Sequence, residues 1–445
     1  MKFINTIKNI WKIEELKNRI LVTLGLLLVY RFGAQVVLPG IDAAQLSNLA
    51  NQTDSGLLGL LNAFTGGAFS NASVFALGIM PYISASIVVQ LMGIAIPYLQ
   101  KLQKEGESGR KKINQITRWL TIAITLVQGP GYIYNLFATL PGEAFMLGDN
   151  LTFVISSVII LTTGTIFAMW LGEKITDKGI GNGISLLIMV GIIATLPQAF
   201  IQEFASRVFE SNGGMVMILL ELVIWFAIIM ASVMLVMAVR QIPVQYARRS
   251  ASGGYEKNVF GSRQYIPLKL NASGVMPIIF AQAIMFIPVA VAGLSDSDTA
   301  QGVTAAFQNI FGFWYNLVFA LLIIIFTYFY TAITVPTNKM ADDLKRSGGF
   351  IPGIRPGTET AEYLDRIMSQ ITLPGSIFLA LIAVFPAIVF SLLGVQQSWA
   401  LFFGGTSLLI MVGVAIDTMQ QVNSYLLNRH YDGLMKTGKN RKAVA

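Results

Sequence analysis

The sequence predicts an all-α polytopic membrane protein with ten transmembrane helices. Hydrophobic residues make up 54% of the 445 positions and charged residues only 12%, about half the charged share of an average soluble protein. The mean hydropathy is +0.64. Apolar stretches of about 20 residues, the length that crosses the hydrocarbon of a bilayer, recur along the chain. This composition excludes a disordered chain and disfavours a soluble enzyme, which needs more polar residues to cover its surface.

Ten apolar stretches have the length and composition of membrane-spanning helices. They are rich in Leu, Ile, Val, Phe, Ala and Gly, and they are too long for strands and do not alternate with period two. In chain order, the predicted spans are residues 20–38, 74–97, 117–137, 152–172, 184–205, 215–239, 274–294, 315–335, 370–393 and 401–427.

The basic residues lie almost entirely on one side of the predicted membrane. Every Lys and Arg except Arg31 and Arg207 falls in six segments on the N-terminal side. These segments are residues 1–19, 98–118, 173–183, 240–272, 336–369 and 428–445. Because cytoplasmic segments carry an excess of Lys and Arg, both termini are predicted to lie in the cytoplasm. The asymmetry also supports an even number of spans.

Residues 1–19 form a basic segment with apolar residues at helical spacing. Phe3, Ile7 and Ile10 are interleaved with lysines. Two interpretations fit this pattern equally well. The segment is either an amphipathic helix lying on an anionic membrane face or an ordinary basic flank of the first span.

Charged residues inside the predicted spans are few. Glu221 lies in the sixth span, Asp417 late in the tenth and Arg31 near the outer end of the first. A charge at the helix centre costs ~2.5–3.5 kcal/mol, so an ion or proton site at Glu221 is one hypothesis. We favour a carboxyl group with a hydrogen-bond partner in the helix bundle, because no second carboxylate or histidine supplies a relay. Asp417 and Arg31 lie near enough to helix ends to be structural anchors.

Residues 61–72 are rich in small residues and are too short and polar to span the membrane. They lie on the outer side, directly before the second span. Irregular backbone at membrane depth is tolerated only where it is buried in protein or faces a water-filled cavity. The residues alone fit a re-entrant segment that fills a vestibule and an external surface loop equally well.

The cytoplasmic segments are longer and more basic than membrane orientation requires. Residues 240–270 interleave Arg and Lys with tyrosines, and residues 101–112 hold a polar hairpin tip. Within 351–357, two prolines and two glycines fix a turn around Arg355, so its side chain is presented from a stiff backbone. We interpret these segments as a docking surface for RNA phosphates or an acidic protein; solvated basic flanks are the alternative.

No catalytic or metal-binding constellation is apparent. Cys is absent and His430 is the single histidine, which excludes disulfides, thiolate sites and multi-histidine metal sites. Residues 179–183 lie between two spans, so their glycines predict a helix-linking turn and not a dinucleotide site. We expect no enzyme activity, no cofactor and no metal. Composition and span count alone would favour a secondary transporter for a small solute, with two inverted five-helix halves.

Specific motifs resemble the bacterial SecY family over essentially the whole chain. Residues 62–87 resemble its plug and second helix, residues 104–110 its first large cytoplasmic loop, and residues 172–185 its fourth-to-fifth helix turn. Four shorter runs complete the resemblance in chain order: Ile242–Arg248, Pro267–Asn271, Ile351–Gly357 and Phe403–Leu409. One departure is Arg240-Gln241, where the family often has paired basic residues, which puts one ribosome or SecA contact in doubt.

The resemblance implies the protein-conducting channel of the Sec pathway, a clamshell of two inverted five-helix halves with a short plug. Unfolded secretory polypeptides would cross its centre, and hydrophobic segments would leave sideways into lipid between helices 2–3 and 7–8. Implied partners are the SecE and SecG membrane subunits, the SecA ATPase and the ribosome, through its protein and rRNA. The implied location is the bacterial plasma (inner) membrane, and the channel itself would hydrolyse nothing. The alternative function is a secondary transporter for a small solute.

The same resemblance divides the chain into parts. Residues 1–19 are the cytoplasmic N-terminal segment, and residues 428–445 are the cytoplasmic tail. The N-terminal half, residues 20–205, holds helices 1–5 and the plug at residues 62–72. The C-terminal half, residues 206–427, holds helices 6–10 and the cytoplasmic loops 240–272 and 336–369.

Site residues are implied position by position. The pore ring comprises Ile79, Ile83, Ile188, Ile279, Ile287 and Ile410; a ring of branched apolar side chains offers no ion ligand and gates by dewetting. The plug includes Asn62, Phe64, Thr65, Gly66, Gly67, Phe69, Ser70 and Asn71. The lateral gate includes Ser84, Gln90 and Gln282, for which interhelical hydrogen bonding is the alternative role. Partner docking is implied for Arg110, Lys111, Arg240, Arg248, Arg249, Lys257, Arg263 and Arg355.

Overall fold

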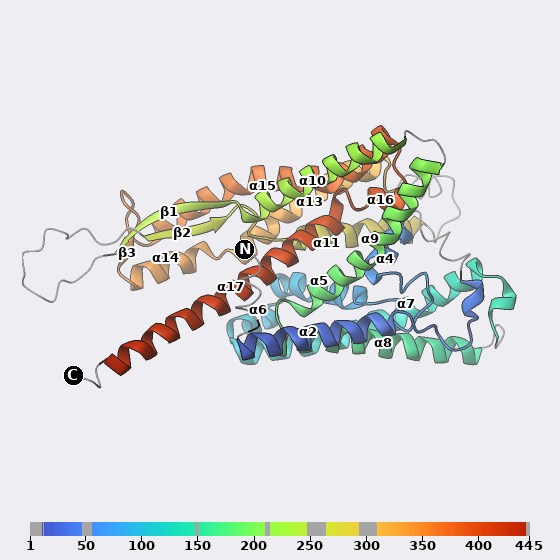
Figure 1. Cartoon of the computed structure of the whole chain (residues 1–445). Helices are drawn as coiled ribbons and strands as arrows, with labels where there is room; N and C mark the ends of the chain where they lie inside the picture. The colour runs from blue at the N-terminus through green and yellow to red at the C-terminus, as the bar shows by residue number, and fades with distance from the viewer. Residues whose placement is uncertain are drawn as a thin grey trace, which may run out of the picture. The chain divides into compact units, whose positions relative to one another are not determined.

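The computed structural model is mostly helical (Figure 1). It describes residue 11 and residues 13–46, 56–146, 151–209, 214–246, 264–292 and 309–441. These residues form two compact units. Unit 1 contains the chain up to Met215 together with Val395–Phe402 and the residues from Val414 onward, and unit 2 contains Val216–Gly394 and Phe403–Gly413.

Unit 1 is built from helices and short turns. Its elements are α2 (Glu14–Gly33), the 3₁₀ turn η1 (Ala43–Gln45), α4 (Gly56–Thr65), α5 (Met80–Ala95), α6 (Pro97–Lys104), α7 (Glu107–Thr139), η2 (Gly142–Ala144), α8 (Leu151–Lys178), α9 (Gly183–Phe209) and α16 (Gln397–Ala400). The last long helix, α17 (Gly405–Arg441), begins in unit 2 and continues in unit 1 from Val414.

Two sequence features shape the helices of unit 1. Pro97 has no backbone N–H and disfavours helical backbone at the preceding Ile96, which is extended, so α5 and α6 meet at a 102° bend. In α7, the buried threonines Thr117, Thr121 and Thr125 donate their hydroxyls to the carbonyls four residues earlier at 2.7–3.0 Å. These bonds satisfy polar groups that could not stay unpaired at membrane depth.

Unit 2 combines long helices with a small antiparallel sheet. Its elements are α10 (Gly214–Met237), β1 (Val239–Tyr246), β2 (Gln264–Lys269), α11 (Met276–Ala292), α13 (Phe313–Thr334), α14 (Thr337–Arg346), β3 (Gly349–Phe350), α15 (Thr358–Leu393) and the start of α17. The strand order is β2-β1-β3. Ile242 pairs with Ile266, and Gln245 pairs with Phe350. One face of the sheet packs with Leu364 and Ile367 of α15 in a buried apolar cluster.

A helix overlaps each of the ten predicted spans. Five described helical stretches are long and apolar enough to cross a membrane: Leu151–Lys178, Gly183–Phe209, Gly214–Met237, Phe313–Arg346 (α13 together with α14) and Thr358–Leu393. The bent pair Met80–Gly93 and Pro97–Gln103 meets the same criterion when taken together. The other predicted spans correspond to α2, α7, α11 and α17.

Residues 240–272, expected only as a cytoplasmic loop, contain secondary structure at both ends. β1 and β2 form an antiparallel hairpin whose strands flank the connecting residues 247–263. Along β1, the side chains of Ile242 and Val244 are buried and Pro243 between them is exposed. This alternation is the period of a strand with one covered face.

Candidate functional site

The 62–72 segment is buried inside unit 1. Asn62, Phe64 and Thr65 at the end of α4 are buried, as are Gly66, Phe69 and Ser70 in the turns that follow. Gly67 and Asn71 are half-buried. Of the two interpretations that the sequence left open, this burial fits the re-entrant segment and does not fit an external surface loop.

Hydrogen bonds within the segment make it a compact body. The Asn62 carboxamide accepts from the Ser70 backbone N–H at 3.1 Å, and the Thr65 hydroxyl accepts from the Phe69 N–H at 3.2 Å. The Gly67 N–H donates to the Asn62 carbonyl at 3.0 Å. Gly66 and Gly67 have φ of +67° and +86°, a region where glycine carries no steric penalty.

The segment packs against α9 through a close approach of two glycines. A Cβ on Gly66 would lie 2.7 Å from Gly191 Cα, and a Cβ on Gly191 would lie 2.7 Å from the Phe64 carbonyl oxygen. The segment also contacts the turn before α5, since a Cβ on Gly78 would lie 3.1 Å from the Thr65 methyl group. Small residues at these positions are therefore required for the packing.

Three predicted pore-ring residues belong to unit 1, close to this packing. Ile79 is buried at the start of α5, directly after Gly78, and Ile83 follows one helical turn later and is half-buried. Ile188 is buried on α9, about one turn before Gly191. The segment thus packs next to the predicted ring residues of its own unit.

Two further predicted ring residues, Ile279 and Ile410, lie on neighbouring helices of unit 2. The Thr406 hydroxyl of α17 hydrogen-bonds the Gln282 carboxamide of α11 at 2.5 Å, and a Cβ on Gly413 would lie 3.5 Å from Val275. These two contacts make α11 and α17 antiparallel neighbours. Ile279 and Ile410 lie between the two contacts, and Ile410 is buried. The side chain of Ile287 lies outside the described residues.

The predicted gate residues have different surroundings. Gln282 is 4% exposed and takes the interhelical bond to Thr406. Gln90 donates to the Ser86 hydroxyl at 3.2 Å along α5, and Ser84 is half-buried on the same helix. The bond of Gln282 fits the interhelical role named as the alternative, whereas the bond of Gln90 stays within α5. A gating role stays a prediction.

Arg355 is held out into solvent by a rigid turn. Its side chain is 87% exposed and pairs with Glu359 at 3.7 Å. The Thr360 hydroxyl donates to the Arg355 carbonyl at 2.8 Å. Gly353 and Gly357 on either side have φ of +86° and +114°, so side chains at these two positions would strain the turn. The predicted stiff presentation of Arg355 agrees with this geometry.

The other predicted docking residues divide between two units and the undescribed residues. Arg110 and Lys111 are exposed in the first turns of α7, and Lys111 pairs with Glu107 at 3.7 Å. Arg240 is exposed on β1, where it pairs in register with Leu268. Arg248, Arg249, Lys257 and Arg263 lie outside the described residues.

The charged groups within the spans are mainly structural. Glu221 is 1% exposed in α10 and has an interaction partner. Sequence reasoning missed a buried ion pair on α9, where Arg207 Nε donates to Glu203 Oε1 at 2.7 Å and both side chains are at most 6% exposed. The signal for it was the spacing of four residues, which places the two side chains on one helix face. Among the described residues, no group of acidic or histidine side chains could hold a metal ion.

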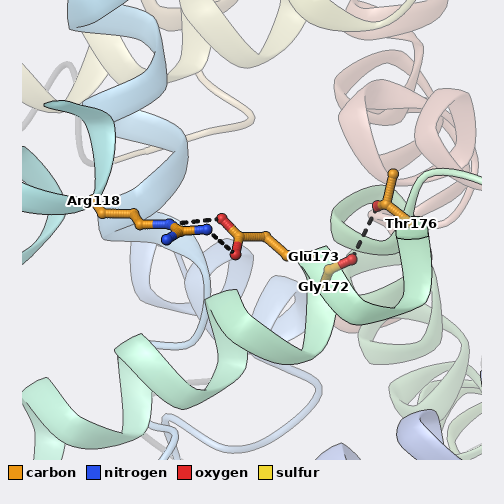
Figure 2. Close-up of polar contacts among 4 residues, drawn as sticks. All are labelled: Arg118, Gly172, Glu173 and Thr176. Carbon is orange, nitrogen blue, oxygen red and sulfur yellow. Dashed lines mark hydrogen bonds and ion pairs between the residues drawn. The ribbon is translucent and has the colours of Figure 1, made fainter. Parts of the chain in front are cut away.

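A second missed ion pair joins α7 to α8. Figure 2 shows the Arg118 guanidinium on both carboxylate oxygens of Glu173, at 3.0 and 2.6 Å. The Thr176 hydroxyl, one turn on, donates to the Gly172 carbonyl at 2.9 Å and accepts from the Gly183 N–H at 2.9 Å. Thr176 therefore caps the start of α9, and residues 179–183 form the predicted helix-linking turn.

Comparison with known proteins identifies the family. A family model described as SecY matches residues 73–419. A protein translocase subunit SecY from Streptomyces scabiei is 40% identical over 444 residues, covering 96% of this chain and 98% of that protein. The subunit of the same name from Escherichia coli strain K12 is 39% identical, with 95% of this chain and 94% of that protein covered.

Solved structures show the same fold. A SecY protein whose plug domain stabilises its closed translocation channel matches with a TM-score of 0.58 and 18% identity over 92% of each chain. Canine Sec61, solved in a ribosome–channel complex from the endoplasmic reticulum, matches with a TM-score of 0.52 and 17% identity, also over 92% of each chain. These matches confirm the predicted ten-helix membrane fold and give no support to a small-solute transporter. The chain belongs to the SecY family of protein translocase subunits.

Proposed function

We propose that this translocase subunit passes unfolded polypeptides through a pore that the isoleucine set and the 62–72 segment keep sealed. The observation that carries the proposal is the burial of that segment against Gly191 and Gly78. These glycines lie next to Ile188 and Ile79. In this proposal the plug blocks the outer side of the ring, and the ring's apolar side chains seal around a chain of any sequence.

The lateral gate and the docking surface complete the proposal. Hydrophobic segments leave into lipid past Ser84 and Gln90 on α5 and Gln282 on α11. Arg355, with the exposed Arg110, Lys111 and Arg240, docks the SecA ATPase or the ribosome, whose phosphates and acidic groups attract arginine. SecE and SecG are the proposed membrane partners. The solved relative in a ribosome–channel complex supports the ribosome as a partner.

The proposed setting is the bacterial inner membrane, with both termini in the cytoplasm. The chain is a multi-pass membrane protein, and the one-sided distribution of Lys and Arg supports this orientation. The proposed channel catalyses no reaction itself, so the energy for transport comes from SecA or from chain synthesis.

Single-channel conductance in planar bilayers tests the plug. The intact complex is compared with a variant that lacks residues 62–72. We expect the intact channel to be silent and the deletion to open a large, poorly selective pore. A deletion variant that inserts at the normal level and still stays silent would contradict the proposed plug.

A further inference from the structure

The plug body, residues 62–71, receives two strong hydrogen bonds from the surrounding helices in the described part of the chain. Arg31 of α2 donates from Nη1 to the Gly66 carbonyl at 2.8 Å. The Tyr132 hydroxyl of α7 donates to the Phe69 carbonyl at 2.8 Å. A third contact, from the Asn71 carboxamide to Gln35, is 3.5 Å long and therefore weak. The two short bonds approach the body from different helices and end on backbone oxygens.

The Arg31 bond is placed where it can be released. Arg31 lines a cavity of about 230 Å³ together with Gln35, Asn71, Gln198 and Gln202. These carboxamides and the water that such a cavity can hold offer other partners to the guanidinium once the Gly66 carbonyl has moved away. Arg31 thereby holds the plug without being left as an unpaired charge when the plug leaves.

The Tyr132 bond is more deeply buried. Tyr132 is 5% exposed, and its ring meets the Phe69 ring edge-on with centroids 4.9 Å apart. Tyr132 belongs to a buried apolar cluster that includes Leu136 and Ile133. Because burial without a partner penalises a hydroxyl, removal of the Phe69 carbonyl costs more here than at Arg31.

One end of the segment is anchored differently from the body. The Leu38 N–H donates to the Ala72 carbonyl and the Val74 N–H donates to the Val36 carbonyl, both at 2.9 Å, in a short bridge between Val37 and Ser73. Ala72 has φ of +42°, which strains a non-glycine residue. This backbone pairing does not depend on the two side-chain bonds.

We propose that Arg31 and Tyr132 are paired latches on the plug, and that releasing them lets residues 62–71 swing out about the anchored pivot at Ala72–Val74. The inference rests on the proposed plug function and adds the groups that set its opening threshold. A polypeptide that enters the pore displaces residues 62–71 as one body and breaks the hydrogen bonds to the Gly66 and Phe69 carbonyls. The anchored residues Ala72–Val74 then return the body to the same place.

The test measures resting anion efflux from proteoliposomes that contain the purified channel complex. Arg31→Met removes a charged donor, and Tyr132→Phe removes a buried neutral donor but keeps the ring. We expect each variant to raise the efflux roughly 3- to 10-fold, with the larger rise in Tyr132→Phe because its bond costs more to release. Arg31→Lys keeps a donor and should fall between Arg31→Met and the parent. The double variant should exceed both single variants.

Matched controls separate latching from general damage. Tyr134→Phe removes an exposed hydroxyl from the same helix, and Arg118→Met removes the arginine of the α7–α8 ion pair. Both should keep the parent's efflux. A channel without residues 62–71 serves as the open reference.

The possible outcomes decide between the two proposals. If Arg31→Met and Tyr132→Phe show the parent's efflux while the channel without residues 62–71 conducts, the latch proposal is overturned and the proposed plug function stands. A silent deletion would overturn the plug itself and the latches with it. An efflux raised equally in the latch and control variants would also overturn the latches, because it would show that any damage to unit 1 is enough to open the channel.

Discussion

At the scale of single residues, Arg355 shows how the chain presents one charge with little conformational freedom. Its backbone is tied by Thr360 and flanked by Gly353 and Gly357 at positive φ, while its side chain stays exposed. The ion pair with Glu359 is solvent-exposed and contributes little, about 0–1 kcal/mol. The guanidinium is therefore free to exchange Glu359 for a partner's carboxylate or phosphate.

Reversing this charge should block docking without unfolding the protein. We expect Arg355→Glu to reduce SecA-driven export about tenfold or more, because the new carboxylate repels an acidic partner and faces Glu359. The measurement is export of a secretory reporter into inverted membrane vesicles at equal channel levels. Arg346→Glu, an exposed reversal at the end of α14, is the control. Normal export by Arg355→Glu would contradict the docking role.

Sequence reasoning predicted the presentation of Arg355 because it is encoded locally, in the prolines and glycines that specify its turn. The residues of 62–72 alone fitted a buried segment and a surface loop equally well, and the plug was implied only by the resemblance to the SecY family. The partners of that segment were missed. Arg31 lies 35 residues away from Gly66 and Tyr132 lies 63 residues away from Phe69, and side-chain bonds to backbone carbonyls carry no signature in the sequence.

At the scale of elements, the buried pair on α9 fixes the short stretch before α17. Glu203 bonds Arg207 through one carboxylate oxygen and accepts the Gln396 N–H at 2.8 Å through the other. Gln202 accepts the Ser398 hydroxyl at 3.1 Å, and Trp399 packs edge-on against Phe200. Residues 395–402 thus dock on α9 through part-buried hydrogen bonds and an aromatic contact.

Neutralising Glu203 should destabilise this docking. Glu203→Gln leaves the Arg207 charge buried beside a neutral amide, and breaking a buried pair in this way costs about 3–5 kcal/mol. We expect a lower midpoint for thermal unfolding of the purified complex. The double variant Glu203→Gln/Arg207→Met should recover part of the loss, because the buried positive charge is gone. An unchanged midpoint in Glu203→Gln would contradict the role of the pair.

The hairpin is the element that the sequence concealed most. Pro243 lies inside β1 and Pro267 inside β2, and proline inside a strand normally argues against one. The structure resolves the conflict, because β3 pairs with β1 only at Gln245 and Tyr246 and leaves Pro243 on an open edge. The ten spans were predictable for the opposite reason, since each is a long apolar run that needs no partner to be recognised.

At the scale of the whole molecule, the proposed orientation in the membrane rests on the distribution of charge alone. The absence of Cys makes this testable with single cysteines on a background that cannot react. We expect an impermeant maleimide to label Glu143→Cys, in the exposed turn after α7, from outside intact spheroplasts. Lys339→Cys in α14 should react only after the cells are opened. The reverse labelling pattern would contradict both termini being cytoplasmic.

Photo-crosslinking of an arrested secretory chain tests the central claim, that polypeptides pass through the isoleucine ring. A photoreactive residue is placed at Ile188, at Ile410 or, as a control, at Leu219, which is 65% exposed on the surface of α10. The account predicts strong adducts with the arrested chain at Ile188 and Ile410 and none at Leu219. Adducts at Leu219 without any at the two isoleucines would contradict it.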